Sequence, residues 1–312
     1  MSIEITTAFV QQYRSNVFHL SQQKGSKLRG AVRVESQKGK SAFYDRIGSV
    51  AAQLRTSRHS DTPILDTPHS RRMVTLADYE WGDMIDNQDK VRMLIDPTSE
   101  YAMAAAWAMG RSMDSVLLAA ALGNAYTGET GSGTQALGTA QRVVPVASTA
   151  AANMNVQALR KAKLILDQGN VDPSIPRYCA INASALESLL SETAVTSSDY
   201  NSVKALVQGE VDTFLGFKFI LTEQIAAPSV AFKFNTGTGL YDGSGTDVTL
   251  ASHKSCVAWA GDGLVLAIGQ DMKAEIAPRP DKGFNTQVYT QMSIGATRLE
   301  EAKVVEILCK QS

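Results

Sequence analysis

The sequence has few of the residues from which catalytic and metal sites are usually recognised. Only three cysteines, Cys179, Cys256 and Cys309, occur among 312 residues, and they lie far apart. This spacing argues against the disulfide framework of a small secreted domain and favours buried thiols in a reducing cytosol. The histidines are equally scattered, and they are His19, His59, His69 and His253.

A large net charge of either sign is also missing. Thirty Lys and Arg residues oppose 31 Asp and Glu residues, which gives a formal net charge of −1 with both signs interspersed. This balance provides no electrostatic reason for strong binding to nucleic acid or to a membrane. It is compatible with a surface that contacts protein partners, where pairs of opposite charge across the interface fix how the two proteins align.

No uninterrupted apolar run is long enough for a membrane span. The longest candidate, residues 101–123, carries Arg111 and Asp114 near its middle, and their spacing lets them meet on one helix face. This pattern favours a soluble helix over a bilayer segment. The N-terminus begins MSIEITTAFV, without a basic start before an apolar run, so we predict no signal peptide.

Two candidate sites have part of a chemical pattern. His59 and His69 share a polar segment with Asp61 and Asp66, but their spacing matches no metal-ligand motif, so a polar loop is favoured. Neither the glycine-rich residues 127–141 nor residues 236–247 complete a phosphate-binding or calcium loop, so they are interpreted as a flexible link and a turn between short strands.

Cys256 and His253 form the other candidate. On a helix the two side chains would share one face, but nothing suggests a third group to align the base. A structural role is therefore favoured for this pair. We predict no catalytic residue, no cofactor and no metal ion, and we expect the protein not to be an enzyme.

Residues 26–86 have the pattern of a long hairpin. KLRGAVRVES alternates apolar and charged residues, and so does the return arm RRMVTLADYEWGD, where Val74 and Leu76 should face inward and Arg72 and Thr75 the surroundings. The two arms are separated by a polar, proline-marked tip. A long hairpin is marginal in isolation, so it needs a surface, which another subunit can supply.

Charged residues gather at the tip of this hairpin. No aromatic residues are interleaved for stacking on nucleic acid. The preferred interpretation is salt bridging to a neighbouring subunit, and a solvated loop is the alternative. The predicted inter-subunit contacts are Arg55, Arg58, Asp61, Asp66, Arg71, Arg72 and Trp81.

The longest predicted helix follows the hairpin. Asp96 can cap it, Pro97 suits its first position, and it should continue to about Leu122, where Gly123 can end it. A helix of some 26 residues is a rod of roughly 40 Å.

A compact α+β part is predicted after the link. A helix over residues 155–169 precedes a strand at 178–181, and Asn182 should cap a helix that runs through Leu190. A further helical turn lies near residues 200–208, and GEVDTFLGFKFILTEQI is interpreted as a helix end stopped at Gly216 before a strand. The last sixty residues contain DGLVLAIGQDMKAEIAP, a short helix or strand, and two strands joined by RLEEAK.

This order of parts resembles the major capsid proteins of tailed bacteriophages, which have the Hong Kong 97-type fold. Similar segments are AFYDRIG, DMIDNQDKVRMLIDPTSEYA, GEVDTFLGFKFILTE and RPDKGFNTQVYTQMSIGATRLEEAKVVEI. The resemblance implies an α+β fold of four parts. These are an N-terminal arm (1–25), an extended hairpin loop (26–86), a peripheral domain with the spine helix (87–143 and 252–312) and an axial domain (144–251).

The resemblance also implies a function and partners. We expect a shell of hexamers and pentamers that encloses phage double-stranded DNA through non-specific contact, assembled in the host cytoplasm and located in the virion capsid. A separate scaffolding protein, a portal and decoration proteins are the further expected partners, and no membrane is involved. The alternatives are an encapsulin-type nanocompartment shell and a soluble enzyme that uses Cys256 with His253.

Overall fold

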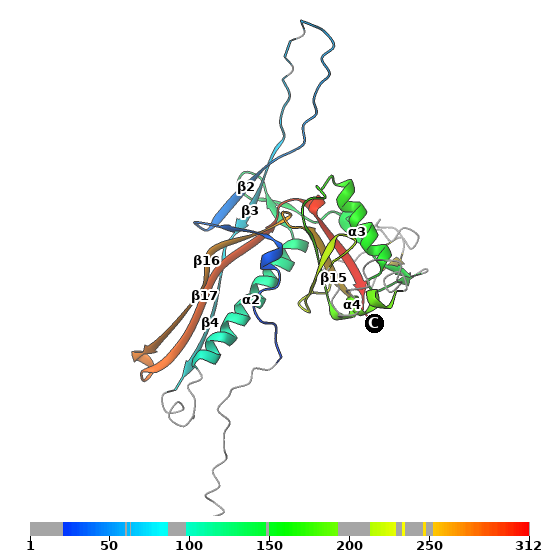
Figure 1. Ribbon diagram of the computed structural model, residues 1–312. Coiled ribbons are helices and arrows are strands. Elements are labelled where there is room, and N and C mark those ends of the chain that lie inside the picture. The colour runs from blue at the N-terminus through cyan, green and yellow to red at the C-terminus, as the bar shows by residue number, and fades with distance from the viewer. Residues whose placement is uncertain are drawn as a thin grey trace, which may run out of the picture. The chain divides into compact units, whose positions relative to one another are not determined.

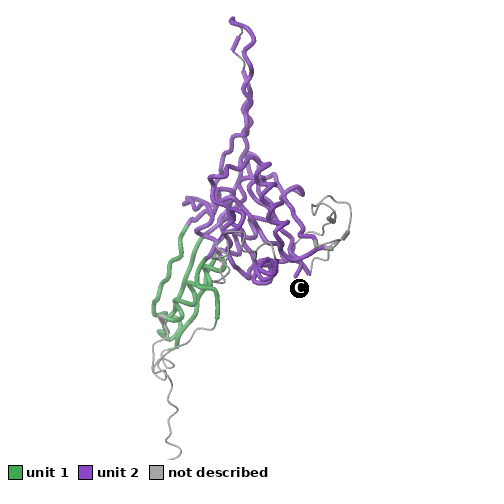
Figure 2. Tube along the Cα trace, turned by 45° about the vertical axis from the view of Figure 1, so that its right-hand side comes forward, with its two compact units in different colours: residues 1–26, 78–112, 270–293 green, residues 27–77, 113–269, 294–312 purple. Residues whose placement is uncertain are grey.

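The structure is a computed structural model that describes residues 21–59, 61–62, 64–86, 98–147, 150–192, 213–228, 233–234, 246–247 and 252–311 (Figure 1). The chain divides into two compact units, which Figure 2 shows in green and purple. Unit 1 consists of residues 1–26, 78–112 and 270–293, and unit 2 of residues 27–77, 113–269 and 294–312.

Helices and strands are mixed along the described chain. The helices are α2 (Thr98–Leu122), α3 (Val156–Gln168) and α4 (Ala183–Ser191), with 3-10 turns at Arg29–Ala31, Thr139–Gln141, Pro280–Lys282 and Glu301–Lys303. The strands are β1 (Arg33–Ser36), β2 (Ser41–Ile47), β3 (His69–Thr75), β4 (Ala77–Ile85), β5 (Ala125–Thr127), β6 (Gly133–Gln135), β7 (Arg142–Val143), β8 (Val146–Ala147), β9 (Ala150–Ala151), β10 (Arg177–Ile181), β11 (Thr213–Phe214), β12 (Phe217–Leu221), β13 (Lys233–Phe234), β14 (Thr246–Asp247), β15 (His253–Ala260), β16 (Leu264–Arg279), β17 (Asn285–Arg298) and β18 (Val304–Lys310). None of these helices is long and apolar enough to cross a bilayer.

The predicted spine helix is confirmed as α2, which ends at Leu122 as expected. Its proposed capping residues, Asp96 and Pro97, lie outside the described residues. In unit 1, Gly110 lets the preceding segment approach, because a Cβ at this position would lie 2.4 Å from the carbonyl carbon of Gly25. The ammonium group of Lys24 lies 5.5 Å from the centre of the Trp107 ring, a cation–π contact on the same helix.

The charged pair in α2 contacts the segment that precedes the hairpin. Arg111 Nη1 donates to the side-chain oxygen of Gln22 at 2.9 Å. The carboxylate of Asp114, which is fully buried, accepts the backbone N–H groups of Lys27 and Leu28 at 3.0 and 3.1 Å. These polar residues therefore fasten the chain that leads into the hairpin.

The long strands β16 and β17 belong to a four-stranded sheet of order β1-β16-β17-β4. The segment predicted as short helix or strand is thus a strand of 16 residues, β16. In unit 1, the Tyr289 hydroxyl donates to Glu80 at 3.0 Å, and Ser293 donates to Asp78. The hydrogen bond to Glu80 raises the pKa of Tyr289.

The core of unit 2 lies against a six-stranded sheet of order β11-β12-β10-β15-β18-β7. Leu159 and Leu166 of α3 are buried in one cluster with Ile181, Val305 and Ile307 of the sheet. Burial of each leucine side chain contributes about 2 kcal/mol relative to exposure. The two predicted strands joined by RLEEAK are confirmed as β17 and β18.

Asparagine side chains cap both helices of this core. The Asn155 side chain accepts the N–H of Ala158 at 2.8 Å, and the Asn182 side chain accepts the N–H of Ala185 at 3.0 Å. Each such cap stabilises its helix by about 1 kcal/mol. The predicted cap at Asn182 and the strand before it are confirmed.

The glycine-rich segment after α2 is not the flexible link that was predicted. It forms β5 and β6, and β5 pairs with the hairpin strand β3 through Met73 and Tyr126, so the sheet order is β2-β3-β5-β6. Gly128 and Gly131 have φ angles of 91° and 74° and make the turn. Glycines here provide a tight connection between paired strands.

The prediction that Gly216 stops a helix is wrong, although its positive φ angle is confirmed. Leu215 and Gly216 have φ angles of 53° and 86° and connect β11 to β12 as a two-residue hairpin turn with both central residues at positive φ. The FKFIL strand is confirmed as β12, which pairs in parallel with β10. The helical turn expected near residues 200–208 lies outside the described residues.

We predict that Gly216→Ala lowers the free energy of unfolding of the unassembled subunit by about 1 kcal/mol, because an alanine rarely adopts this φ angle. An added Cβ meets nothing within 4 Å, so the effect isolates the backbone. Gly30→Ala is the matched control, since Gly30 also has open space but an ordinary φ angle. Urea unfolding of both variants measures the difference, and equal losses would contradict the explanation.

Candidate functional site

The hairpin formed by β2 and β3 is the candidate functional site. Its strands pair antiparallel from Ser41 opposite Thr75 to Ile47 opposite His69. Beyond this register the N–H of Gly48 donates to Pro68 at 2.8 Å, and the chain then continues into a tip without strand structure. Figure 2 shows this tip extending away from the rest of unit 2.

The tip exposes apolar side chains that its own unit does not cover. Leu54 is 88% exposed and Ile64 is 95% exposed. Further exposed side chains of this kind are Ile47, Val50 and Leu65. Several exposed apolar side chains on a projecting element are typical of a protein–protein contact, because their burial offsets the entropy lost when the tip becomes ordered.

The predicted contact residues at the tip are exposed. Among the described residues, Arg58, Asp61 and Asp66 have no ion-pair partner. Arg55 Nε donates to the carbonyl of Ser57 at 2.9 Å, so it supports the local turn. These charges are therefore available to a partner on a surface of mixed sign.

Two other predicted contact residues, Arg71 and Trp81, make contacts within the chain. Arg71 Nε donates to Asp45 at 2.6 Å across the two strands, and its guanidinium carbon lies 5.3 Å from the centre of the Phe43 ring. The hydrogen bond to Asp45 raises the pKa of Arg71. Trp81 lies on β4 of unit 1, where its side chain is half-buried and its carbonyl accepts the Thr290 hydroxyl at 3.4 Å.

The expectation that Arg72 faces the surroundings is wrong. Arg72 is 3% exposed, and its Nη2 donates to Glu301 at 2.6 Å. The physical reason is the two-residue period of a strand, which places Arg72 on the same inward face as Val74. Burial lowers the pKa of Arg72, and the Glu301 carboxylate opposes that shift.

The Glu301 carboxylate lies among three guanidinium groups at the base of the hairpin and offsets part of their positive charge. Its carboxylate lies 3.9 Å from Arg46 on β2, 2.6 Å from Arg72 on β3 and 3.7 Å from Arg298 on β17. The Nε atoms of these three arginines are buried and have no hydrogen-bond partner among the described residues. We refer to these four residues as the Glu301 cluster.

Arg298 connects this cluster to the end of the spine helix. It is completely buried, and its Nη1 donates to the carbonyl groups of Ala121 and Gly123 at 2.7 and 2.9 Å, while Nη2 donates to that of Gln135 at 3.1 Å. Burial lowers the pKa of Arg298. A positive side chain is favourable at this end of a helix, where the carbonyl groups lack helical partners.

Sequence reasoning missed Arg46, Arg298 and Glu301. The available signal was the charged connection RLEEAK between two apolar strands, which must lie against something that compensates its charge. Nothing in the sequence indicates which distant arginines reach it, because Arg46 and Arg72 are more than 200 residues away.

The two candidate chemical sites have a different arrangement from the one their spacing suggested. His59 is exposed at the hairpin tip, whereas His69 lies at the base opposite Ile47. His253 and Cys256 both lie on strand β15, where a spacing of three places them on opposite faces. His253 Nδ1 lies 3.0 Å from the Ser252 hydroxyl.

All three thiols are buried in the core of unit 2 as predicted. Cys179 pairs with Ala258, two residues after Cys256, and Cys256 pairs with Ile307, two residues before Cys309. Because residues two apart on a strand share a face, the three cysteines lie on one face of neighbouring strands. Burial raises the pKa of Cys179 and Cys309 well above the ordinary thiol value. A protonated, inaccessible thiol is a poor nucleophile.

A projecting hairpin, a long spine helix and a mixed α+β core together define the Hong Kong 97-type capsid fold. The chain belongs to the phage capsid protein family, whose pattern matches residues 5–311. No curated protein matches the sequence.

Solved phage capsid structures share the fold at low identity. The capsid of cyanophage P-SCSP1u is similar with a TM-score of 0.74 and 17% identity, over 99% of this chain and 95% of that one. The acid-stable capsid of Helicobacter pylori bacteriophage KHP30 has a TM-score of 0.72 and 10% identity, over 100% and 98%. The capsid of Ralstonia phage GP4 has a TM-score of 0.69 and 11% identity, over 98% and 96%.

We predict that Glu301→Ala lowers the free energy of unfolding by about 3 kcal/mol, because it leaves buried arginines without a counter-ion. Glu300→Ala is the matched control. Glu300 is half-exposed, and its ion-pair partner within the described residues is Lys303 at 3.3 Å, so its loss should cost less than about 1 kcal/mol. Thermal and urea unfolding of the two variants test this difference, and similar losses would show that Glu301 has no special role.

Proposed function

We propose that this phage capsid protein is the major shell subunit, which assembles through hexamers and pentamers into an icosahedral particle around double-stranded DNA. The observation that supports this proposal most directly is the hairpin tip, whose apolar side chains are exposed in their own unit. In a shell, each hairpin lies on a neighbouring copy. Assembly takes place in the host cytoplasm, and the product is the virion capsid.

Many weak contacts suffice for such a shell. Each copy both gives a hairpin and receives one, so contacts repeat around closed rings and strengthen one another. Arg58, Asp61 and Asp66 then meet opposite charges on the neighbour, which selects the register rather than supplying most of the affinity.

The four-part division proposed from the sequence describes roles in the shell. The N-terminal arm is residues 1–25, the extended loop 26–86, the peripheral domain 87–143 with 252–312, and the axial domain 144–251. The six-stranded sheet of unit 2 contains β10 and β12 from the axial range and β15 and β18 from the peripheral range. One compact unit can therefore contribute to two roles.

Further partners are proposed on the same basis. A separate scaffolding protein guides assembly, a portal occupies one vertex, and decoration proteins bind the outer surface. The packaged DNA meets the shell by non-specific contact, which is weak because the net charge is close to zero. An encapsulin-type compartment would instead hold a cargo protein, and the contents of purified particles distinguish the two. The buried state of Cys256 gives no support to a Cys/His enzyme.

We predict that electron microscopy of the assembled protein shows icosahedral particles, and that the double variant Leu54→Glu with Ile64→Glu abolishes them. Both side chains are exposed, so the free energy of unfolding of the subunit should change by less than about 0.5 kcal/mol. Gln157→Glu, an exposed position on α3, adds negative charge outside the hairpin and should leave assembly intact. Normal particles from the double variant would contradict the role of the tip.

A further inference from the structure

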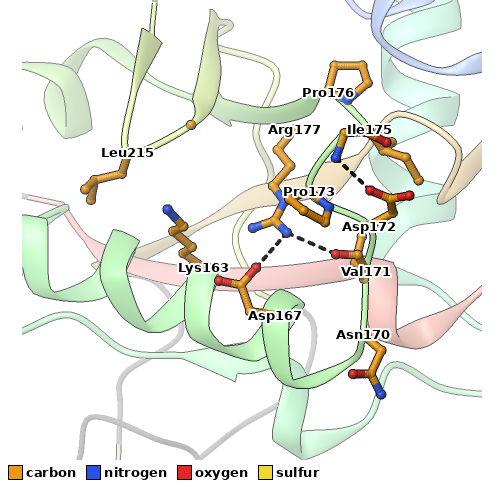
Figure 3. A pocket seen from close by; sticks show the side chains of 12 residues that line it. Lys163, Asp167, Asn170, Val171, Asp172, Pro173, Ile175, Pro176, Arg177 and Leu215 are labelled. Carbon is orange, nitrogen blue, oxygen red and sulfur yellow. Dashed lines mark hydrogen bonds and ion pairs between the residues drawn. The ribbon is translucent and has the colours of Figure 1, made fainter.

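Unit 2 has an open groove of about 700 Å³ to which no role has been given. Its wall consists of the last turns of α3, the loop of residues 170–177 and the turn at Leu215–Gly216 (Figure 3). Three proline and isoleucine residues, Pro173, Ile175 and Pro176, form an apolar rim. Prolines restrict the backbone of this rim, so little further ordering is needed when something binds.

A buried arginine lies at the centre of the groove. Arg177 is 5% exposed, and its Nη2 donates to the Asp167 carboxylate at 2.6 Å and to the carbonyl of Val171 at 3.2 Å. Its Nε is buried without a hydrogen-bond partner among the described residues. The guanidinium has more N–H donors than Asp167 and Val171 engage, so an acceptor that reaches it from the groove can form a further charge-assisted hydrogen bond.

A second cation lines the same wall. Lys163 lies one helical turn before Asp167, a spacing that normally forms an ion pair, but the Asp167 carboxylate is already engaged by Arg177. Lys163 has no ion-pair partner among the residues that the structure describes. One carboxylate therefore faces two cations on the inner wall.

The other carboxylate of the groove does not compensate this excess. Asp172 is exposed on the rim, and Figure 3 shows it on the opposite side of Pro173 from Lys163. It accepts the N–H of Ser174 at 2.8 Å, and this hydrogen bond lowers its pKa. Solvent screens the exposed Asp172 and Lys163 alike, so the excess of positive charge is confined to the wall on which Lys163 and Arg177 lie.

The opposite rim holds a residue in an unfavourable conformation. Leu215 has a φ angle of 53°, where asparagine or glycine is the usual choice. Its side chain is half-buried beside the groove and is carried there by the hairpin turn. Backbone strain that places an apolar side chain on the edge of a cationic groove is consistent with a binding role.

We propose that this groove receives an acidic side chain, Asp or Glu, from a second copy of the chain, with its carboxylate between Lys163 and Arg177. An arginine inside an apolar rim is typical of the centre of a protein–protein interface. The proposal rests on the proposed function, because a shell supplies the second copy. The groove is thus a contact between subunits that is separate from the hairpin tip.

The test compares two charge reversals on one helix, Lys163→Glu and Arg160→Glu. Both positions are exposed on α3, but only Lys163 lines the groove. In cells that carry the phage's other assembly genes, Lys163→Glu should lower the particle yield at least tenfold. Arg160→Glu should stay within about twofold of wild type, and Lys163→Arg should restore assembly. Equal midpoint temperatures of thermal unfolding for the three variant subunits would show that each one still folds.

A second measurement identifies the occupant. Wild-type particles assembled from mixed ¹⁴N and ¹⁵N chains are treated with a zero-length carbodiimide, which joins an ammonium group to a contacting carboxylate. We expect a peptide that contains Lys163 from one isotope and an Asp or Glu from the other. Links only within one isotope, links to a different protein, or equal yields for Lys163→Glu and Arg160→Glu would overturn the proposal. Absence of wild-type particles would instead count against the shell function itself.

Discussion

The carboxylate of Glu301 is the constraint on which the geometry of unit 2 depends. Three guanidinium groups approach it, two from the strands of the hairpin and one from the strand that meets the end of the spine helix. Arg72 and Arg298, which are buried, would repel each other in a medium of low polarity if the carboxylate were missing. The direction in which the hairpin leaves the core is therefore set by electrostatics as well as by strand pairing.

This anchoring divides the hairpin into a fixed base and an uncovered tip. The base is held by the Glu301 cluster, by Arg71 with Asp45 and by the pairing of β3 with β5. A tip presented on a fixed base loses less conformational freedom on binding than one on a loose connection, which favours association. The glycine-rich turn contributes here, since β5 and β6 widen the sheet that supports the base.

The elements with a strong local signal were predictable from the sequence. The alanine-rich spine helix, the cap at Asn182 and the strands β12, β17 and β18 follow from periodicity and capping chemistry. Gly216 was misinterpreted because a glycine ends helices and makes hairpin turns by the same positive φ angle. Arg72 was assigned to the wrong face, although the two-residue period of the strand places it with Val74. Its partners in the Glu301 cluster could not be found, because they come together only in the folded chain. The groove around Arg177 likewise requires α3 and the β11–β12 turn to be placed together.

The location of the three cysteines has a consequence for the life of the particle outside the cell. Their thiols lie within the packed interior of unit 2, against one face of its sheet. Oxidants and reductants in solution cannot reach them without opening the fold, and the raised pKa values of Cys179 and Cys309 keep the thiolates of these two residues scarce. A change from reducing to oxidising surroundings therefore leaves the covalent structure of the folded subunit unchanged.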